Sequence, residues 1–358
     1  MEKIILNKYK VIEENDSGSF STVYKVMDDN NQLFAIKKVS IPLSDKKKEK
    51  IIKEKNINED INDYLVKIID NEKIIYNKLK DSKHLLSFKE FVQDNNDYYF
   101  IMDYVEDIKT YYDKNVITTR DIILMSIDIC DSLIELEKNN MIHGDIKPSN
   151  IFISDNSYLL GDFSSVTKNG QKVLFSTKNF MAPEIYEKKN VSYSSDIYSL
   201  GIVMYLLLSG DLPFVDESIN EEDAFKIRMK GELIPDIFGV DQKLMKIIKK
   251  CCSYSVNDRY SSASILKDEL CKLGNFNKNI ISNTENAKGK DNKIDNKVND
   301  NLFIEIKDEN KNINLKDEPT ISIYDEKLVS ESKKYKANIS DSNFIKNVHI
   351  FPEDYKAI

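Results

Sequence analysis

Hydrophobic and polar residues alternate along the first part of the chain, from residue 9 to residue 39. A period of two is typical of β-strands with one buried face. Turn-forming residues at 16–19 and 28–31 divide this stretch, which therefore predicts three antiparallel strands in a meander. The pattern beyond it predicts one main helix and two more strands, at about 64–79, 85–93 and 98–104. Together these elements predict a small unit of five strands and one helix.

The pattern becomes helical from Thr118 onward. Thr118 or Thr119 is suited to cap the first helix, because a threonine hydroxyl can accept a hydrogen bond from the free N–H groups of the first turn. Apolar residues then recur on one helix face, at Ile122, Met125, Ile129, Leu133 and Leu136. Two short strands and four later helices are predicted at 151–154, 158–161, 195–208, 221–230, 242–252 and 262–273.

The composition changes after Gly274. The remaining residues are rich in Asn, Lys, Asp and Ser, and their charges nearly cancel, which predicts a disordered or only locally ordered tail. Two apolar stretches within it, 302–306 and 344–351, are candidates for docking on a partner. The predicted organisation is a smaller unit over residues 1–103, a larger helical unit over 104–273 and a tail over 274–358.

Composition and charge narrow the functional classes. The net charge of −8 argues against non-specific nucleic-acid binding, so no nucleic-acid partner is expected. The longest apolar run, Ile202–Leu208, is far too short to span a membrane, and the N-terminal residues lack the layout of a signal peptide. The four cysteines form no Cys-x-x-Cys pair. Buried thiols in a reducing compartment are the simpler interpretation, and we expect a cytoplasmic protein.

The densest group of chemically active residue types is the run His-Gly-Asp-Ile-Lys-Pro-Ser-Asn, from His143 to Asn150. Asp145 and Asn150 stand five residues apart on one short predicted loop, and Asp162 follows twelve residues later. A phosphoryl-transfer site needs one carboxylate to meet the attacking hydroxyl, and an amide and a second carboxylate to hold Mg²⁺. A capped turn before Pro148 would explain Asp145 and Asn150 alone, but not their spacing from Asp162.

With these motifs the chain resembles the eukaryotic-type protein kinase superfamily, serine/threonine branch, over roughly residues 9–272. Met-Ala-Pro-Glu, ending at Glu184, is similar to the motif that closes the family's activation segment, here Asp162 to Glu184. Asp196 matches the family's aspartate that braces the catalytic loop, and Arg259 matches the arginine that pairs with that glutamate. The resemblance implies an α+β fold of two lobes: a small five-stranded β lobe with one main helix, and a larger, mostly helical lobe.

The resemblance also implies a role for each residue of the loop. Asp145 would orient the acceptor hydroxyl, and Lys147 would lie against the γ-phosphate. Asn150 and Asp162 would be the metal ligands, because amide and carboxylate oxygens suit a hard cation. The implied cofactors are ATP and Mg²⁺, with Mn²⁺ as an alternative ion. The implied partner is a protein substrate with a serine or threonine acceptor.

Lys37 ends the sequence Phe-Ala-Ile-Lys in a predicted strand, which is similar to the family's Val-Ala-Ile-Lys. Alone, it would be interpreted as a solvated strand lysine. The resemblance implies that it binds the α- and β-phosphates and forms an ion pair with Glu72 on the predicted helix. Glu54 and Glu59 are competing partners. The long interval between Lys37 and Glu72 suggests an inserted segment at about 44–60.

The family's glycine-rich loop corresponds to residues 16–23, where Gly18 is the one glycine that remains. One glycine still allows the backbone to approach phosphates, although Asp16 would repel them, so weaker ATP binding is expected. The resemblance assigns the other nucleotide contacts, around the adenine and along the hinge, to Val23, Ala35, Phe152, Met102, Asp103 and Val105. It implies an apolar stack joining the lobes, which plain core packing would also explain, from Tyr76, Phe88, His143 and Phe163.

Two positions depart from the family pattern. Gly144 stands where most members have an arginine that receives a phosphate on the activation segment. We therefore hypothesise that activity does not require phosphorylation of this segment. Ser164 stands where the family has glycine. Serine disfavours positive φ, so a stiffer segment and a slower, but not inactive, enzyme is expected.

Three functional interpretations remain open. The leading one is an active serine/threonine protein kinase. A pseudokinase acting as a binding scaffold is favoured by the eroded glycine loop and Ser164, and opposed by the complete catalytic set. Small-molecule phosphotransferases of the aminoglycoside or choline kinase type share His-Gly-Asp, but Lys147, Thr177 and Ala-Pro-Glu favour protein kinases. An acidic cluster at 216–223 would favour basic peptides if it faced the substrate, although a solvated surface is the simpler interpretation.

Overall fold

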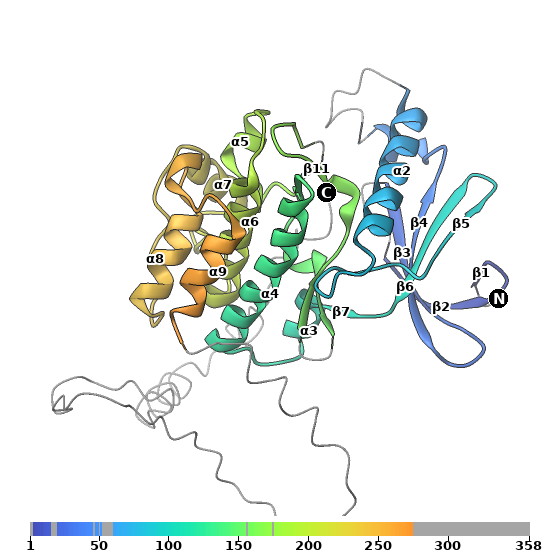
Figure 1. Cartoon of the computed structure of the whole chain (residues 1–358), viewed down its shortest axis with the longest axis horizontal. Helices are drawn as coiled ribbons and strands as arrows, with labels where there is room; N and C mark the ends of the chain where they lie inside the picture. Colours follow the sequence, from blue (N-terminus) through green and yellow to red (C-terminus); the bar gives the residue numbers. More distant parts are fainter. Residues whose placement is uncertain are drawn as a thin grey trace, which may run out of the picture. The chain divides into compact units, whose positions relative to one another are not determined.

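The computed structural model describes residues 3–15, 20–45, 47–49, 51, 60–154, 157–173 and 175–274. These residues belong to one compact unit. Its N-terminal part is an antiparallel sheet and its C-terminal part is helical (Figure 1), as the α+β expectation requires. Outside the described residues lie Asp16, Gly18, Glu54, Glu59 and the predicted tail beyond Gly274. The predicted domain boundaries at residues 103 and 273 stay predictions.

The N-terminal sheet has six strands in the order β1-β2-β3-β4-β6-β5. Their bounds are Ile4–Ile5 for β1, Tyr9–Asn15 for β2, Ser21–Met27 for β3, Leu33–Ser40 for β4, Glu90–Asp94 for β5 and Asp97–Asp103 for β6. Five of these are the predicted strands, and β1 is an additional edge strand. The alternation of side chains puts Ile36 and Ile101 in a separate cluster on one face and leaves Lys37 on the other.

The strand predicted over 85–93 is wrong in its first half. Strand β5 begins only at Glu90, and Leu85 forms an isolated parallel bridge with Leu160. The N–H of Leu86 donates to the carbonyl of Leu160 at 2.8 Å, and the N–H of Leu160 donates to the carbonyl of His84 at 3.0 Å. Leu85 and Leu86 thus pair with Leu160 in the C-terminal part of the protein, and pairing with β6 begins only at Lys89, whose N–H donates to the carbonyl of Ile101 at 2.7 Å.

Helix α2, Ile61–Leu79, is the main helix of the N-terminal part. The Asp60 carboxylate caps it by accepting the N–H groups of Asn62 and Asp63 at 2.8 and 3.3 Å. Its buried face recurs with helical period and joins the main core, which also contains Phe100 and Met102 from the sheet. Glu72 is the one ionisable carboxylate on that buried face.

The C-terminal part is built around helices α4 and α6, which pack against α8 and α9. The helices are α3 Ile108–Tyr112, α4 Thr119–Lys138, α5 Pro183–Tyr186, α6 Tyr193–Ser209, α7 Glu221–Met229, α8 Gln242–Cys251 and α9 Ala263–Cys271. The predicted cap of α4 is confirmed at Thr118, which forms a capping box with Asp121. No helix among the residues just given is both long and apolar enough to cross a membrane.

Two small sheets frame the loop from His143 to Asn150. Strand β9 (Ile151–Ser154) pairs with β10 (Ser157–Leu160) and β7 (Glu106–Asp107), and β8 (Met141–Ile142) pairs with β11 (Thr167–Lys168). The loop therefore runs from β8 to β9. It contains the 3₁₀ turn η1, Pro148–Asn150, and a second 3₁₀ turn, η2, covers Phe163–Ser165.

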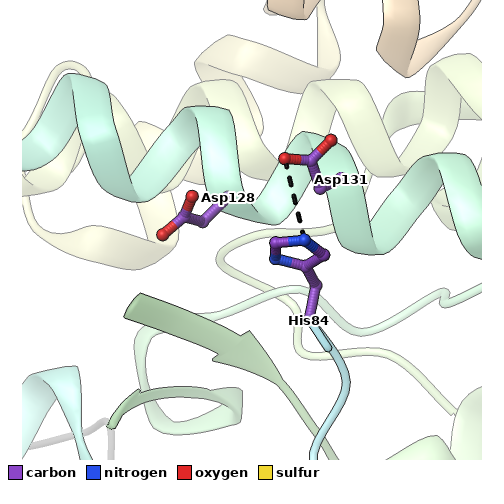
Figure 2. A group of neighbouring side chains, drawn as sticks. All are labelled: His84, Asp128 and Asp131. Atoms are coloured by element: carbon purple, nitrogen blue, oxygen red, sulfur yellow. Dashed lines mark ion pairs between the residues drawn. The ribbon is translucent and has the colours of Figure 1, made fainter. Parts of the chain in front are cut away.

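The loop after α2 is attached to α4. Figure 2 shows His84 directed at Asp131 on α4, with Asp128 one turn earlier. The Ser132 hydroxyl donates to the carbonyl of His84 at 2.7 Å, and Nε2 of His84 lies 4.0 Å from the Asp131 carboxylate. Asp131 also pairs with Lys267 of α9. This attachment connects the helix that carries Glu72 to the helical part of the protein.

Candidate active site

A buried carboxylate fixes the backbone of the loop that begins at His143. Asp196, in the first turn of α6, accepts the N–H groups of His143 and Gly144 at 2.7 and 2.8 Å. Burial raises the pKa of Asp196 to about 7, against these two hydrogen bonds, which lower it. The ring of His143 is buried, its Nε2 lies 3.0 Å from the carbonyl of Gly161, and burial lowers its pKa, so the imidazole is neutral. The loop is thus held from two sides.

Asp145 lies at the centre of a hydrogen-bonded group. Asn150, brought back by the turn η1, donates through Nδ2 to the backbone carbonyl of Asp145 at 2.8 Å. Nζ of Lys147 lies 2.9 Å from the Asp145 carboxylate and donates to the hydroxyl of Thr177 at 2.9 Å. The N–H of Thr177 donates to Oδ1 of Asp145 at 2.7 Å. The loop and the activation segment therefore meet at Asp145.

Lys37 lies between two carboxylates. Its Nζ is 2.8 Å and 3.0 Å from the carboxylate oxygens of Glu72, and 2.7 Å from Oδ1 of Asp162. The Lys37 and Glu72 side chains are buried. Burial lowers the pKa of Lys37, but the charges of Asp162 and Glu72 outweigh burial and raise it, so the side chain is an ammonium ion. The expected pair with Glu72 therefore has the required geometry.

The backbone of Asp162 has a left-handed conformation, unlike that of the turn that follows it. Its φ is 61°, in the left-handed region, and the 3₁₀ turn Phe163–Ser165 follows. Burial raises the pKa of the Asp162 carboxyl, but Lys37 outweighs burial and holds that pKa well below its usual range. The carboxylate is therefore charged at any physiological pH.

Ser164 lies in that 3₁₀ turn and does not have a positive φ, so its replacement of glycine requires no unfavourable backbone conformation here. The positive φ belongs to Asp162 two positions earlier. Instead, the Ser164 hydroxyl donates to Oδ1 of Asp162 at 2.9 Å. Sequence reasoning missed this bond, although a hydroxyl two residues after a carboxylate is a short-range signal for it.

The predicted apolar stack forms a continuous series of rings. The centroid distances are 5.0 Å from Phe88 to Tyr76, 4.8 Å from Tyr76 to Phe163 and 5.8 Å from Phe163 to His143. These rings connect the segment before β5, α2, the activation segment and the catalytic loop. Pairs of aromatic rings favour edge-to-face geometry, and all three ring pairs have this geometry.

The residues assigned to the nucleotide lie on the central strands around Lys37, namely β3, β4 and β6, on the segment that follows β6, and on β9. Ala35 pairs with Met102 across β4 and β6, and Met102 is buried. Strand β6 ends at Asp103, Val105 packs against the main core, and Phe152 lies opposite Asp107 in the small sheet. Val23 pairs with Lys37 across β3 and β4 and is 40% exposed, so it is available to a ligand.

A second buried ion pair lies at the end of the activation segment. Arg259 donates from both terminal nitrogens to the two carboxylate oxygens of Glu184, each at 2.8 Å. The Ser195 hydroxyl donates to the same carboxylate at 2.6 Å. The pairing expected from the resemblance thus has bidentate geometry.

The acidic cluster at 216–223 is partly neutralised. Glu222 pairs with Lys178 of the activation segment, and Asn179 donates to Glu221 at 2.5 Å. Asp223 pairs with Lys226 at 2.9 Å. These contacts favour the solvated or internally paired interpretation over a site for basic peptides.

Two apolar residues of the activation segment were missed by sequence reasoning. Val173 lies against Gly144, and Phe175 is buried against Phe20 and Tyr64. The available signal was the apolar run Val173-Leu174-Phe175, which interrupts a polar stretch from Lys168 to Ser176.

Comparisons with known proteins agree with this geometry. A family model described as Protein kinase domain matches residues 9–271. The chain is similar to Myosin light chain kinase 3 of Rattus norvegicus, 29% identical over 232 residues, which is 62% of this chain and 29% of the relative. It is similar to Serine/threonine-protein kinase plk-1 of Caenorhabditis elegans, 28% identical over 199 residues, covering 53% and 30% of the two chains. For Serine/threonine-protein kinase DCLK3 of Mus musculus the identity is 24% over 214 residues, covering 56% and 27%. The chain thus spans less than a third of each relative's length.

Proposed function

The chain belongs to the protein kinase family, and we propose that it is an active serine/threonine protein kinase, which transfers the γ-phosphoryl group of ATP to protein hydroxyls. The observation that supports this most is the position of Lys37 between Glu72 and Asp162. Phosphoryl transfer depends on such charge placement more than on covalent chemistry. A scaffold would not need three buried or partly buried charges held together at this cost in desolvation.

The donor atoms of the site fit a hard cation such as Mg²⁺. Asn150 uses its amide nitrogen on Asp145, which leaves its carbonyl oxygen as a ligand atom. Lys37 and Ser164 both donate to Oδ1 of Asp162, which leaves Oδ2 as the second. Oxygen ligands of this kind are those that Mg²⁺ prefers. When bound, the ion would neutralise charge on the transferred phosphate.

The remaining residues position the acceptor and the phosphates. Asp145 would accept the hydrogen bond of the attacking hydroxyl through its carboxylate. Lys147 contacts both Asp145 and Thr177, so it places a positive charge next to the Asp145 carboxylate, where the acceptor hydroxyl would bind. Lys37 would bind phosphate oxygens, and Glu72 keeps its ammonium group directed into the site. The pairing of Lys147 with Thr177 supports serine or threonine acceptors.

The test is transfer of labelled γ-phosphate from ATP with Mg²⁺, to a generic basic protein and to the chain itself. The same preparation carrying Asp162→Asn controls for co-purifying kinases, and acid hydrolysis identifies the labelled amino acid. Label on serine or threonine that depends on Asp162 would support the proposal. If folded protein gives no transfer with either Mg²⁺ or Mn²⁺, and none to sugars, choline or aminoglycosides, the scaffold alternative is correct.

Removing the Ser164 hydroxyl should weaken metal binding. One hydrogen bond contributes about 0.5–1.5 kcal/mol, so Ser164→Ala and Ser164→Gly should raise the Mg²⁺ concentration for half-maximal stabilisation by ATP about two- to tenfold. The measurement is a Mg²⁺ titration of the thermal unfolding midpoint at fixed ATP. Alanine separates loss of the hydroxyl from glycine flexibility. Identical titrations for wild type and Ser164→Ala would contradict a role for the hydroxyl.

Dephosphorylation should leave the activity intact. The chain has three arginines. Arg228 donates to the carbonyl of Asn179 and Arg259 is paired with Glu184, while Arg120 lies in the first turn of α4. Since position 144 is glycine, the loop offers no arginine to a phosphate on the segment. The initial rate after phosphatase treatment and removal of the phosphatase should stay within about twofold of the untreated rate. A loss of activity, restored by rephosphorylation, would refute this expectation.

A further inference from the structure

The activation segment passes directly against Gly144 at Val173. The φ of Gly144 is +81°, and a Cβ built there would lie 2.9 and 3.0 Å from the two γ carbons of Val173. It would also lie 3.2 Å from the carbonyl oxygen of Ser165. The valine methyl groups therefore fill the space in which any side chain at position 144 would begin.

The segment is fixed on both sides of this contact. Before it, β11 pairs with β8, and the N–H of Gly170 donates to the carbonyl of Val191 at 2.9 Å. After it, the N–H of Thr177 donates to Oδ1 of Asp145 at 2.7 Å. Val173 lies between these two attachments, so its packing decides how closely the middle of the segment approaches the catalytic loop.

Phe175 extends the apolar contact to the N-terminal part of the protein. Its ring is buried, 5.4 Å from the ring of Phe20 before β3 and 5.9 Å from that of Tyr64 on α2. Tyr64 is two helical turns before Glu72 on the same helix. The segment thus contacts both the catalytic loop and the helix that holds Lys37, and it does so through hydrocarbon surface.

We propose that Val173 and Phe175 are positioning residues, whose packing against Gly144 and against Phe20 and Tyr64 fixes the activation segment in place of a phosphate. This inference deepens the proposed kinase function and rests on it. Apolar packing of these side chains is present in the folded chain without any modification, whereas a phosphate must be added and can be removed. The segment is therefore ordered as soon as the chain has folded, and Thr177 and Asp145 are in contact from the start.

The test compares Val173→Ala, Phe175→Ala and Val173→Ile with the wild type. A displaced segment misaligns Asp145, so both alanine variants should lower kcat at least about tenfold, with the KM for ATP changed by less than about twofold. Isoleucine keeps both γ carbons and should stay within about threefold of the wild-type rate. Val116→Ala, at a fully solvated valine, is the matched control and should behave as wild type.

Limited trypsin digestion gives a second readout that needs no catalysis. Lys172 and Lys178 flank the two apolar residues, so cleavage there should rise at least about tenfold in both alanine variants, with cleavage elsewhere unchanged. If wild type and Val173→Ala have equal rates and equal protection, the inference is wrong while the kinase proposal stands. Cleavage that rises at all sites together would also overturn it, since the residues would then act only on global stability. If the wild type transfers no phosphate, the kinase proposal fails, and the trypsin pattern still decides the packing claim.

Discussion

Replacing Asp162 with asparagine is expected to lower the rate of phosphoryl transfer by at least about 100-fold. Asparagine keeps the shape of the side chain but removes the charge that Lys37 contacts at 2.7 Å and that a cation would need. The pKa of Asp162 lies well below its usual range because Lys37 outweighs the effect of burial, so the wild-type group is always charged. The variant loses that charge at every pH.

Two measurements separate this effect from misfolding. The thermal unfolding midpoint without ligand should change little, whereas the additional stabilisation by ATP on adding Mg²⁺ should disappear. Asp113→Asn, at an exposed aspartate after α3, is the matched control and should retain wild-type activity. A normal rate in Asp162→Asn would exclude this carboxylate as a metal ligand.

Replacing Arg259 with leucine is expected to lower the free energy of unfolding by about 3–5 kcal/mol, because it leaves the buried Glu184 carboxylate without its partner. The guanidinium side chain is fully buried and also donates to the backbone carbonyls of Ser253 and Tyr254. Urea denaturation measures the change. Arg120→Leu, at an exposed arginine, should cost much less, and a loss below about 1 kcal/mol in Arg259→Leu would contradict the role assigned to the pair.

The same pair predicts a pH dependence of stability. Burial raises the pKa of Glu184, but the hydrogen bonds and charge of Arg259 outweigh burial and hold the pKa below its ordinary value of 4.5. A lowered carboxyl pKa contributes stability that is present above pH 4.5 and is lost as the pH falls through the lowered pKa. The difference between wild type and Arg259→Leu should therefore shrink on acidification.

Local pattern was sufficient for most of the fold. The strands of the meander and the cap of α4 depend on neighbouring residues, and both were predicted, the cap as Thr118 or Thr119. The first half of the strand over 85–93 was not, because Leu85 and Leu86 pair with Leu160, far along the chain. The same alternating pattern suits either partner, so the pattern alone does not identify the pairing.

The candidate site also has residues that the sequence could locate and contacts that it could not. Asp145, Asn150 and Asp162 could be located by spacing, and Glu72 by its place on a helix of the implied fold. The contact of Val173 with Gly144 could not, because a missing side chain gives no indication of which residue fills its place. The positive φ of this turn lies at Asp162, which the sequence did not indicate, since backbone dihedrals depend on the packing around the turn.

The contact of Gly144 with Val173 also restricts how this sequence can evolve. An arginine at position 144 would need the left-handed φ of +81° and the volume that the valine now fills. A phosphorylatable residue at position 173 would gain a phosphate with no arginine to receive it. An arginine at position 144 therefore cannot be accommodated unless Val173 moves, although the segment already contains hydroxyl residues such as Ser176 and Thr177. The first cost of phosphate-dependent control in this sequence would be the loss of the packing between Val173 and Gly144.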